Sequence, residues 1–233
     1  MIPIPKIIDG ELSGKTMLTD RLAIFSVRLF QPMPFVAGQF VTMGIRDDPV
    51  VQKRAFSVAS SPNNPDVLEF FIKRTDTGTF TSALFSKDVG QPMQVIGPSG
   101  DFVLDTSAKR ITFISAGAGI SPFMSMVRKI IEDDMDIEVV FIQGVSYEKC
   151  LAFREELEGY ARDHERFSYV PTISREAPDW NGERGRAESI LPRIIQAPEG
   201  LGYICGPPAM VQNTKLALKD LGFSDGQIRV ESW

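Results

Sequence analysis

The sequence predicts two domains: an antiparallel β-barrel over residues 1–106 and a doubly wound α/β domain with a parallel sheet over 107–233. Up to residue 100, short segments rich in branched and aromatic residues are separated by Pro-, Asn- and Asp-containing turns, which is typical of antiparallel barrels and sandwiches. From residue 110, apolar segments of strand length alternate with longer helical segments, which indicates a parallel sheet covered on both faces. The length of 233 residues suffices for two domains of ordinary size.

In the first domain we expect short strands and one short helix. The helix begins after Gly78, with Thr79 or Thr81 as its cap. Gln31-Pro32-Met33-Pro34 ends the first predicted strand, because proline cannot donate to a ladder. The predicted strands are 22–30, 39–45, 54–60, 67–74 and 92–96.

In the second domain strands and helices alternate. The predicted strands are 111–115, 137–142, 167–173, 201–205 and 228–231, and the predicted helices are 122–132, 151–163, 187–195 and 207–221. Residues 174–186 are expected to form a loop.

Composition excludes several classes of protein. The formal net charge is −5, from 25 Lys+Arg and 30 Asp+Glu, which argues against nucleic-acid binding through phosphate neutralisation. The two cysteines, Cys150 and Cys205, exclude a disulfide scaffold and a four-cysteine cluster, and the single His164 leaves no histidine metal triad, so no metal site is expected. No secretory signal and no apolar run of membrane-spanning length is found, so we expect a cytoplasmic protein that does not bind a membrane.

A glycine loop follows the first strand of the second domain. Residues 116–122 give a G-x-G-x-x-P pattern between a strand and a helix, where glycines bring backbone N–H groups and the helix N-terminus close to a pyrophosphate. Pro122 falls in the first helical turn, where its missing N–H costs little. The alternative is a tight turn without a ligand.

Two segments of the barrel could hold a phosphate. Arg54 lies in a predicted strand and requires an anion if it faces inward, with the aromatic Phe56 on the same face and the hydroxyl of Ser57 on the other. The helix start at 78–84 offers backbone amides and hydroxyls to a second phosphate. The alternatives are an edge strand with a surface arginine and an ordinary capped helix.

Cys205-Gly206-Pro207-Pro208-Ala209-Met210 comes directly after a buried-type strand. In open α/β sheets ligands bind at the carboxyl ends of strands, so we expect Cys205 to face such a site. The alternative is a small buried apolar residue, the usual role of a free cysteine.

Taken together, these motifs resemble those of the ferredoxin–NADP reductase superfamily. Arg54-Ala55-Phe56-Ser57 resembles its flavin motif, Gly78-x-x-Thr81 its flavin pyrophosphate motif and Gly97-Pro98-Ser99-Gly100 its domain-junction turn. Gly117-x-Gly119-x-x-Pro122 resembles its nicotinamide dinucleotide loop, and Cys205-Gly206-Pro207-Pro208-x-Met210 its final strand end. The resemblance covers almost the whole chain.

The resemblance implies FAD and a nicotinamide dinucleotide as cofactors. Arg54 would neutralise the flavin pyrophosphate, Phe56 would pack on the isoalloxazine, and Ser57 would hydrogen-bond near N5. Cys205 would lie beside the nicotinamide, Glu231 would polarise the Ser57–Cys205 pocket, and Trp233 would cover part of the flavin. The implied FAD-binding residues are Arg54, Ala55, Phe56, Ser57, Ile72, Lys73, Gly78, Thr79, Phe80, Thr81 and Trp233. The implied nicotinamide dinucleotide residues are Gly117, Ala118, Gly119, Pro122, Cys205, Gly206, Pro207 and Met210.

The choice between NADP and NAD depends on charge near the adenosine ribose. A 2′-phosphate requires basic groups and hydroxyls, whereas NAD enzymes place a carboxylate on the 2′-OH. Gly144-Val145-Ser146-Tyr147 follows strand 137–142 without that carboxylate, and Ser174 and Arg175, with Arg184 and Arg186 farther along, resemble the 2′-phosphate segment of plant-type members. This favours NADP, although Ser146 stands where several bacterial relatives carry Arg, and NAD stays open as the alternative.

The implied activity is hydride transfer from NADPH, or NADH, to FAD, followed by electron transfer to a separate acceptor. Because Cys150 and Cys205 cannot ligate a plant-type [2Fe–2S] cluster, the expected acceptor is ferredoxin, flavodoxin or another redox protein. Lys53, Arg54, Lys73 and Arg74 could steer it electrostatically. The alternatives are an NAD(P)H-dependent reductase of free flavin and a flavin-carrying electron-transfer subunit of a larger oxidoreductase.

Overall fold

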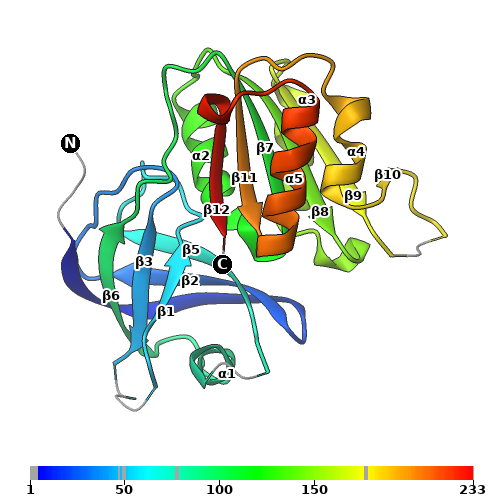
Figure 1. Ribbon diagram of the computed structural model, residues 1–233. Coiled ribbons are helices and arrows are strands. Elements are labelled where there is room, and N and C mark those ends of the chain that lie inside the picture. The colour runs from blue at the N-terminus through cyan, green and yellow to red at the C-terminus, as the bar shows by residue number, and fades with distance from the viewer. Residues whose placement is uncertain (1–4, 47, 49–50, 77–78, 176–177, 233) are drawn as a thin grey trace. The chain divides into compact units, whose positions relative to one another are not determined.

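The structure is a computed structural model that describes all residues except 1–4, 47, 49–50, 77–78, 176–177 and 233 (Figure 1). Its contacts divide the chain into two compact units. The first comprises the residues up to Leu104 together with Ser121–Lys129, and the second comprises Asp105–Ile120 together with the residues from Ile130 onward. The boundary between residues 106 and 107 stays a prediction.

The first unit is a nearly closed antiparallel barrel, which confirms the predicted architecture. Its six-stranded sheet has the order β4-β3-β6-β1-β2-β5, and every paired neighbour runs antiparallel. Beyond β4 the Ala59 N–H donates to Glu69 O of β5 at 2.7 Å, so the two outer strands approach each other. The elements are β1 (Lys6–Thr19), β2 (Leu22–Leu29), β3 (Phe40–Ile45), β4 (Arg54–Ser57), β5 (Val67–Lys73), α1 (Thr79–Phe85) and β6 (Pro92–Ser99).

The longest strand of this barrel, β1, is absent from the sequence prediction. Gly10 and Gly14 interrupt its apolar alternation, and both lie where β1 closely approaches β2. A Cβ on Gly10 would lie 2.4 Å from Arg28 O, and Gly14 follows a register shift after Leu12. Sheet pairing therefore requires glycine at position 10, and both glycines weaken the sequence signal.

Alternating side chains of these strands fill the barrel. In β2, Ala23, Phe25, Val27 and Leu29 are buried while the residues between them are more exposed, as expected for a strand with one face on a core. The ring centroids of Phe25 and Phe85 are 5.1 Å apart, which brings the end of α1 into the same core.

Helix α2 (Ser121–Glu132) contributes its first residues to the barrel unit. Arg128 Nη1 donates to Glu69 Oε1 at 2.7 Å and to Ala59 O at 2.9 Å, at the join between β4 and β5. Because both side chains of this ion pair are largely buried, with exposed fractions of 15% and 24%, it fixes the helix on the barrel more firmly than a surface pair does.

The second unit is a parallel six-stranded sheet of order β10-β9-β8-β7-β11-β12, which confirms the predicted α/β class. Ile114 of β7 packs with residues of α4 and α5 on one face, while Phe113 stacks with Phe141 and Tyr203 on the other. The elements are β7 (Arg110–Ala116), η1 (Gly117–Ile120), β8 (Glu138–Val145), η2 (Glu148–Cys150), α3 (Arg154–Asp163), β9 (Phe167–Ile173), β10 (Glu183–Arg184), α4 (Ala187–Ile194), β11 (Leu201–Gly206), α5 (Pro208–Asp220), η3 (Asp225–Gln227) and β12 (Ile228–Ser232).

Several boundaries differ from the sequence prediction: β6 and β8 extend three residues farther, α3 begins at Arg154, and two further differences have a clear physical reason. The strand predicted over 54–60 ends at Ser57, because the chain then leaves β3 and pairs with β5 through Ala59. The loop predicted over 174–186 contains the short strand β10, which a two-residue pairing with Thr172 and Ile173 of β9 defines. A strand of that length has no sequence periodicity to detect.

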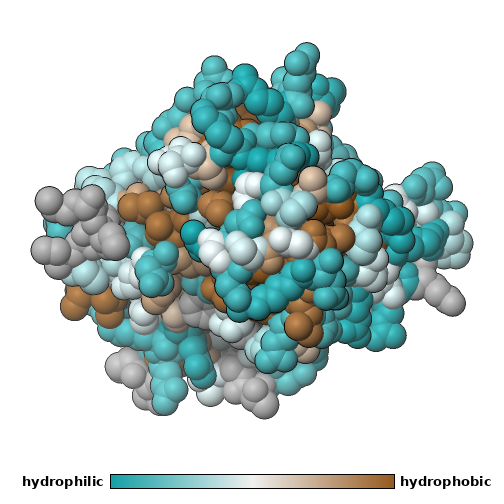
Figure 2. Space-filling view, turned by 45° about the horizontal axis from the view of Figure 1, so that its top comes forward, coloured by the Kyte–Doolittle hydropathy of each residue, from teal (hydrophilic) through white to brown (hydrophobic). Residues whose placement is uncertain are grey.

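On the face drawn in Figure 2, apolar residues form separate patches among hydrophilic ones. The large apolar side chains with exposed surface include Ile7, Met17, Phe30, Val89, Tyr147, Leu216 and Val230. None of the helices among the described residues has both the length and the apolar character needed to cross a membrane.

We predict that Gly10→Ala lowers the free energy of unfolding by about 1–3 kcal/mol, because its Cβ has no space beside Arg28 O. Gly14→Ala is the matched control, since its Cβ would meet only the Ser26 side chain at 3.2 Å. Urea unfolding of both variants measures the difference, and equal stabilities would refute the close approach of β1 and β2.

Candidate functional site

The glycine loop connects the first strand of the second unit to α2. Gly117 has φ +56°, and a Cβ added to it would meet nothing within 4 Å, so its backbone borders open space. Gly117 and Ala118 are exposed, whereas Gly119 and Pro122 are buried. The backbone at 117–118 is therefore accessible to a ligand, as the sequence predicts for a pyrophosphate loop.

Gly119 allows the loop to lie against the end of β11. A Cβ on Gly119 would be 2.2 Å from Cys205 O and 2.8 Å from the Gly206 nitrogen, distances that no side chain tolerates. Gly206 is similarly tight, because its Cβ would lie 3.2 Å from Met210 Sδ and 3.3 Å from Ala116 O. These glycines bring two backbone segments into contact at the carboxyl ends of β7 and β11.

The strand order makes this the expected ligand site of the sheet. The chain goes from β7 to β8 on one side and later returns to β11 on the other side of β7, so the order reverses between β7 and β11. In open α/β sheets ligands bind at the carboxyl ends of strands at such a reversal.

Cys205 lies in a row of three paired residues at this edge. Its Cα partners are Ser115 of β7 and Glu231 of β12. Cys205 and Ser115 are fully buried, and Glu231 is half-buried. Because paired residues of adjacent strands direct their side chains to the same face, the thiol, the Ser115 hydroxyl and the Glu231 carboxylate line one side of the sheet. Ser115 was not among the site residues predicted from the sequence, although its place before the glycine loop could have indicated it.

After Cys205 the chain enters α5. Pro207 is the N-cap residue and is exposed, whereas Met210 is 8% exposed and packs in the core with α4. Pro207 is therefore exposed directly after the end of β11, and Met210 packs against Gly206.

The residues predicted to bind a 2′-phosphate follow the neighbouring strands. The Ser174 N–H donates to Val145 O at 3.0 Å and the Arg175 N–H donates to Ser146 O at 3.1 Å, so both lie beside the end of β8. Ser174, Arg175 and Arg186 are exposed. Among the residues that the structure describes, the guanidinium groups of Arg175 and Arg186 have no hydrogen-bond or ion-pair partner.

Arg184 differs from the other two arginines. Its Nη2 donates to Trp180 O at 2.7 Å, so the guanidinium is used within the segment between β9 and α4. The indole of Trp180 is buried beneath the same segment. Sequence reasoning gave no role to this tryptophan, because an isolated aromatic residue among charged ones carries no periodicity.

In the barrel, the flavin motif forms strand β4. Arg54 is exposed and, within the described part of the chain, has no ion-pair partner, whereas Ser57 is buried. Phe56 is half-buried, with its ring centroid 5.6 Å from that of Phe80 and 6.5 Å from that of Phe70. Ala55 is half-buried between them. The strand thus presents a free cation beside an aromatic ring that is anchored in the core.

The other predicted flavin residues offer mainly their backbone. Ile72 is 1% exposed with its side chain in the barrel core, and Lys73 is exposed at the end of β5. Strand directions alternate along the sheet order, and Ala59 pairs with Glu69, so Lys73 lies at the same end of the barrel as Arg54. Arg74 follows, with its Cζ 5.9 Å from the Phe85 ring centroid.

Helix α1 begins at the predicted phosphate segment. Thr79 is exposed, Phe80 is fully buried, and Thr81 Oγ1 accepts a hydrogen bond from Thr75 N at 3.2 Å. The buried Phe80 ring leaves only its backbone for a ligand. Gly78 and Trp233 lie outside the described residues.

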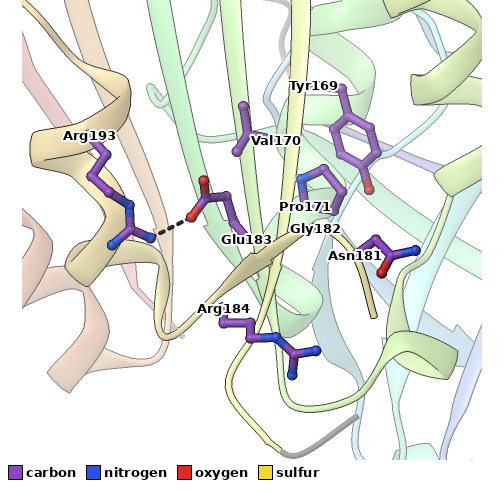
Figure 3. Close-up of a pocket in the computed structure, with 8 residues that line it drawn as sticks. All are labelled: Tyr169, Val170, Pro171, Asn181, Gly182, Glu183, Arg184 and Arg193. Atoms are coloured by element: carbon purple, nitrogen blue, oxygen red, sulfur yellow. Dashed lines mark hydrogen bonds and ion pairs between the residues drawn. The ribbon is translucent and has the colours of Figure 1, made fainter. Parts of the chain in front are cut away.

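An open hollow of about 600 Å³ lies elsewhere, beside β9 and β10 (Figure 3). Glu183 and Arg193 form an ion pair at its wall, and the Tyr169 hydroxyl donates to Gln143 Oε1 at 2.5 Å. Burial, the largest cause, raises the pKa of Tyr169 well above its usual range, so this phenol stays neutral. The hollow is at the outer edge of the sheet and does not include the row at Cys205.

The geometry fits the two cofactors that the sequence implies. Open space above Gly117 suits a pyrophosphate held by backbone amides, and unpartnered arginines suit phosphates in both units. The chain also matches two family models: Oxidoreductase FAD-binding domain over residues 9–104 and Oxidoreductase NAD-binding domain over residues 113–215. Together these matches cover most of the chain.

The chain belongs to the ferredoxin–NADP reductase superfamily. It is an oxidoreductase with an FAD-binding and an NAD-binding domain. It is 28% identical over 208 residues to ferredoxin–NADP reductase B of Sorangium cellulosum, with 85% of each chain covered. It matches the crystal structure of a ferredoxin NADP⁺ reductase from Neisseria gonorrhoeae with bound FAD and NADP at a TM-score of 0.87 and 25% identity, covering 97% of this chain and 98% of that one.

Other members of this superfamily are components of larger systems. The chain is 30% identical over 208 residues to the reductase component of phenol 2-monooxygenase from Pseudomonas sp. strain CF600. This match covers 87% of the present chain. It spans only 58% of that relative and 66% of the anthranilate 1,2-dioxygenase electron transfer component of Acinetobacter baylyi.

We predict different effects of alanine at the two loop glycines. Gly119→Ala should destabilise the loop itself, because its Cβ overlaps Cys205 O. Gly117→Ala has space and should cost only about 1–2 kcal/mol for its left-handed backbone, but its methyl group would occupy the space above the loop. We expect Gly117→Ala to keep the fold and weaken NADP⁺ binding at least about tenfold. Calorimetric titration with NADP⁺, alongside thermal unfolding, measures both, and wild-type affinity in Gly117→Ala would refute the loop assignment.

Proposed function

We propose that this protein oxidises NADPH in preference to NADH, reduces its FAD and passes the electrons to a separate redox protein. The observation that supports this most is the row of Ser115, Cys205 and Glu231 at the sheet edge, with the glycine loop pressed against Cys205 O. This edge can receive the nicotinamide half of a dinucleotide whose pyrophosphate lies at Gly117.

When bound, FAD accepts a hydride from the reduced nicotinamide and releases electrons one or two at a time. The chain positions the reactants. Arg54, which has no ion-pair partner among the described residues, would neutralise the flavin pyrophosphate, with the backbone at Lys73, Gly78 and Thr79–Thr81 completing the site. Ser57 would donate or accept a hydrogen bond at the flavin edge, and Phe56 would support the ring with the free part of its surface.

The buried Cys205 thiol would contact the nicotinamide and fix its orientation. A weakly polar side chain suits this role, because it adds no charge beside the transferred hydride. Since Cys205 is fully buried in the structure, the contact requires the groups that cover the thiol to move when the nucleotide binds. The half-buried carboxylate of Glu231 on the adjacent strand would supply negative potential to the same face.

Charge supports NADP over NAD. Arg175 and Arg186 are exposed, and within the described chain their guanidinium groups have no partner, while the Ser174 hydroxyl is beside Arg175. The end of β8 and the two residues after it, Gly144-Val145-Ser146-Tyr147, contain no carboxylate for a ribose 2′-OH. A 2′-phosphate would satisfy both cations with charge-assisted hydrogen bonds.

The acceptor is proposed from local charge and from the relatives. Lys53, Arg54, Lys73 and Arg74 place basic groups at one end of the barrel in a protein of net charge −5. This arrangement suits an acidic ferredoxin or a flavodoxin. The similarity to the phenol 2-monooxygenase reductase component and the anthranilate 1,2-dioxygenase electron transfer component favours a second candidate, the reductase of an oxygenase system. We also propose a cytoplasmic location, consistent with Cys150 and Cys205 both being free thiols.

We expect the purified protein to be yellow and to be reduced anaerobically by NADPH faster than by NADH.

Arg175→Ala should raise the KM for NADPH about tenfold and leave the KM for NADH unchanged, because it removes one 2′-phosphate contact. Arg162→Ala on α3 is the control, since this exposed arginine pairs only with Asp163 among the partners in the described chain. Flavin absorbance in a stopped-flow instrument follows the reduction, and equal changes for both nucleotides would exclude the NADP assignment. A colourless protein that does not bind FAD would exclude the flavoenzyme.

Cys205→Ala should slow the reduction of bound flavin by NADPH about tenfold or more, while FAD binding is unchanged, because the thiol orients the nicotinamide. Cys150→Ala is the matched control, because Cys150 is the other free cysteine and lies in η2, away from the end of β11. Single-turnover absorbance measures the rate at saturating NADPH. A wild-type rate in Cys205→Ala would leave the thiol with a packing role only.

A further inference from the structure

Among the described residues between β9 and α4, Trp180 is buried while its neighbours are exposed or half-buried. Its side chain is 5% exposed and packs in a cluster with Val145, Leu151 and Ile173. Val145 and Ile173 are the last residues of β8 and β9. The indole therefore lies beneath the two strand ends from which Ser146 and Ser174 continue.

Two hydrogen bonds link Trp180 to the following residues of the segment, one through its indole and one through its backbone carbonyl. Trp180 Nε1 donates to Glu183 O at 2.8 Å, and Arg184 Nη2 donates to Trp180 O at 2.7 Å. Gly182 packs directly on the ring, since a Cβ there would lie 2.6 Å from Trp180 Cζ2. Because β10 contributes only two paired residues, these contacts supply much of what holds the segment in place.

Arg154 at the start of α3 lies over the indole ring. Its Cζ is 5.3 Å from the ring centroid, within the range of a cation–π contact. Glu148 accepts a hydrogen bond from Arg154 Nη1 at 2.5 Å, and Glu158 accepts one from its Nε at 2.6 Å. The arginine is thereby fixed in orientation and its charge is compensated within η2 and α3.

These contacts separate the arginines of the segment into two kinds. Arg184 is engaged with Trp180 O, so its guanidinium braces the segment. Arg175 and Arg186, by contrast, have no side-chain partner among the residues described. Arg175 is held through its backbone to Ser146 O, directly above the Trp180 cluster.

We infer that Trp180 is a positioning residue for nucleotide selectivity: its buried indole, covered by Arg154, and its backbone carbonyl, bound by Arg184, hold the segment that carries Arg175 and Arg186, so that one anionic 2′-phosphate contacts both. Ordering two exposed arginines before binding lowers the conformational cost of capturing the phosphate. The inference rests on the proposed preference for NADPH. It assigns Arg184 to the brace, whereas the sequence placed it among the phosphate ligands.

The test uses Trp180→Phe in the FAD-loaded, full-length protein. Phenylalanine keeps most of the apolar packing and removes the N–H that reaches Glu183 O. Gly182→Ala is the second variant, because its methyl group displaces the indole without removing it.

Tyr203→Phe is the matched control. It removes the polar group of another buried aromatic residue, the hydroxyl that accepts a hydrogen bond from Asp105 N at 3.1 Å. The readouts are calorimetric affinities for 2′,5′-ADP and 5′-AMP, and KM and kcat with each nicotinamide nucleotide.

We expect both segment variants to weaken 2′,5′-ADP binding about fivefold and to raise the KM for NADPH similarly, while 5′-AMP affinity, the KM for NADH and both kcat values stay within about twofold. Tyr203→Phe should lower thermal stability without changing these ratios. If Arg175→Ala and Arg186→Ala weaken 2′,5′-ADP binding but Trp180→Phe and Gly182→Ala do not, or weaken 5′-AMP equally, the positioning role is refuted and the proposed function stands. If the two arginine variants leave 2′,5′-ADP binding unchanged, the NADPH preference itself fails.

Discussion

The contact between two backbone segments at Gly119 and Cys205 is the constraint on which the candidate site depends. A side chain at position 119 would overlap Cys205 O, so only glycine lets the turn after β7 lie against the end of β11. This contact brings the open backbone at Gly117 close to the buried thiol. Both features occur where the strand order reverses, so one steric requirement defines where a ligand can enter the sheet.

Strand register then determines which side chains share this edge. Parallel pairing aligns Ser115, Cys205 and Glu231 across three strands, and the neighbouring ends of β8 and β9 carry Ser146, Ser174 and Arg175. The polar groups are therefore graded along the edge, from a thiol and a carboxylate at one end to cations at the other. Such a gradient suits an extended ligand with an uncharged ring at one end and phosphates at the other. Because the protein has a net charge of −5, the attraction of phosphates to this edge depends on the local position of the arginines and not on the overall charge.

The parts of the site that sequence could predict are those in which the backbone does the binding. Gly117 and Gly119 carry a visible pattern, because glycine is favoured by the left-handed backbone at 117 and required by the close approach at 119. Arg54 could be inferred from its charge within a strand. Strand β1 could not, since Gly10 and Gly14 remove the alternation that identifies strands, and the pairing with β2 leaves no room for a Cβ at Gly10. Trp180 could not either, because its partners Val145, Ile173 and Arg154 come from separate elements that only the fold brings together.

The central claim is that the carboxyl edge between β7 and β11 binds the nicotinamide dinucleotide. Hydrogen–deuterium exchange of the FAD-loaded protein, with and without saturating NADP⁺, tests this most directly, because bound phosphates slow the exchange of the amides that contact them. We expect slower exchange in peptides that contain Gly117–Ile120 and Gly206, and a smaller effect around Ser174 and Arg175. Unchanged exchange at Gly117–Ile120, with protection at another part of the second unit, would contradict the claim.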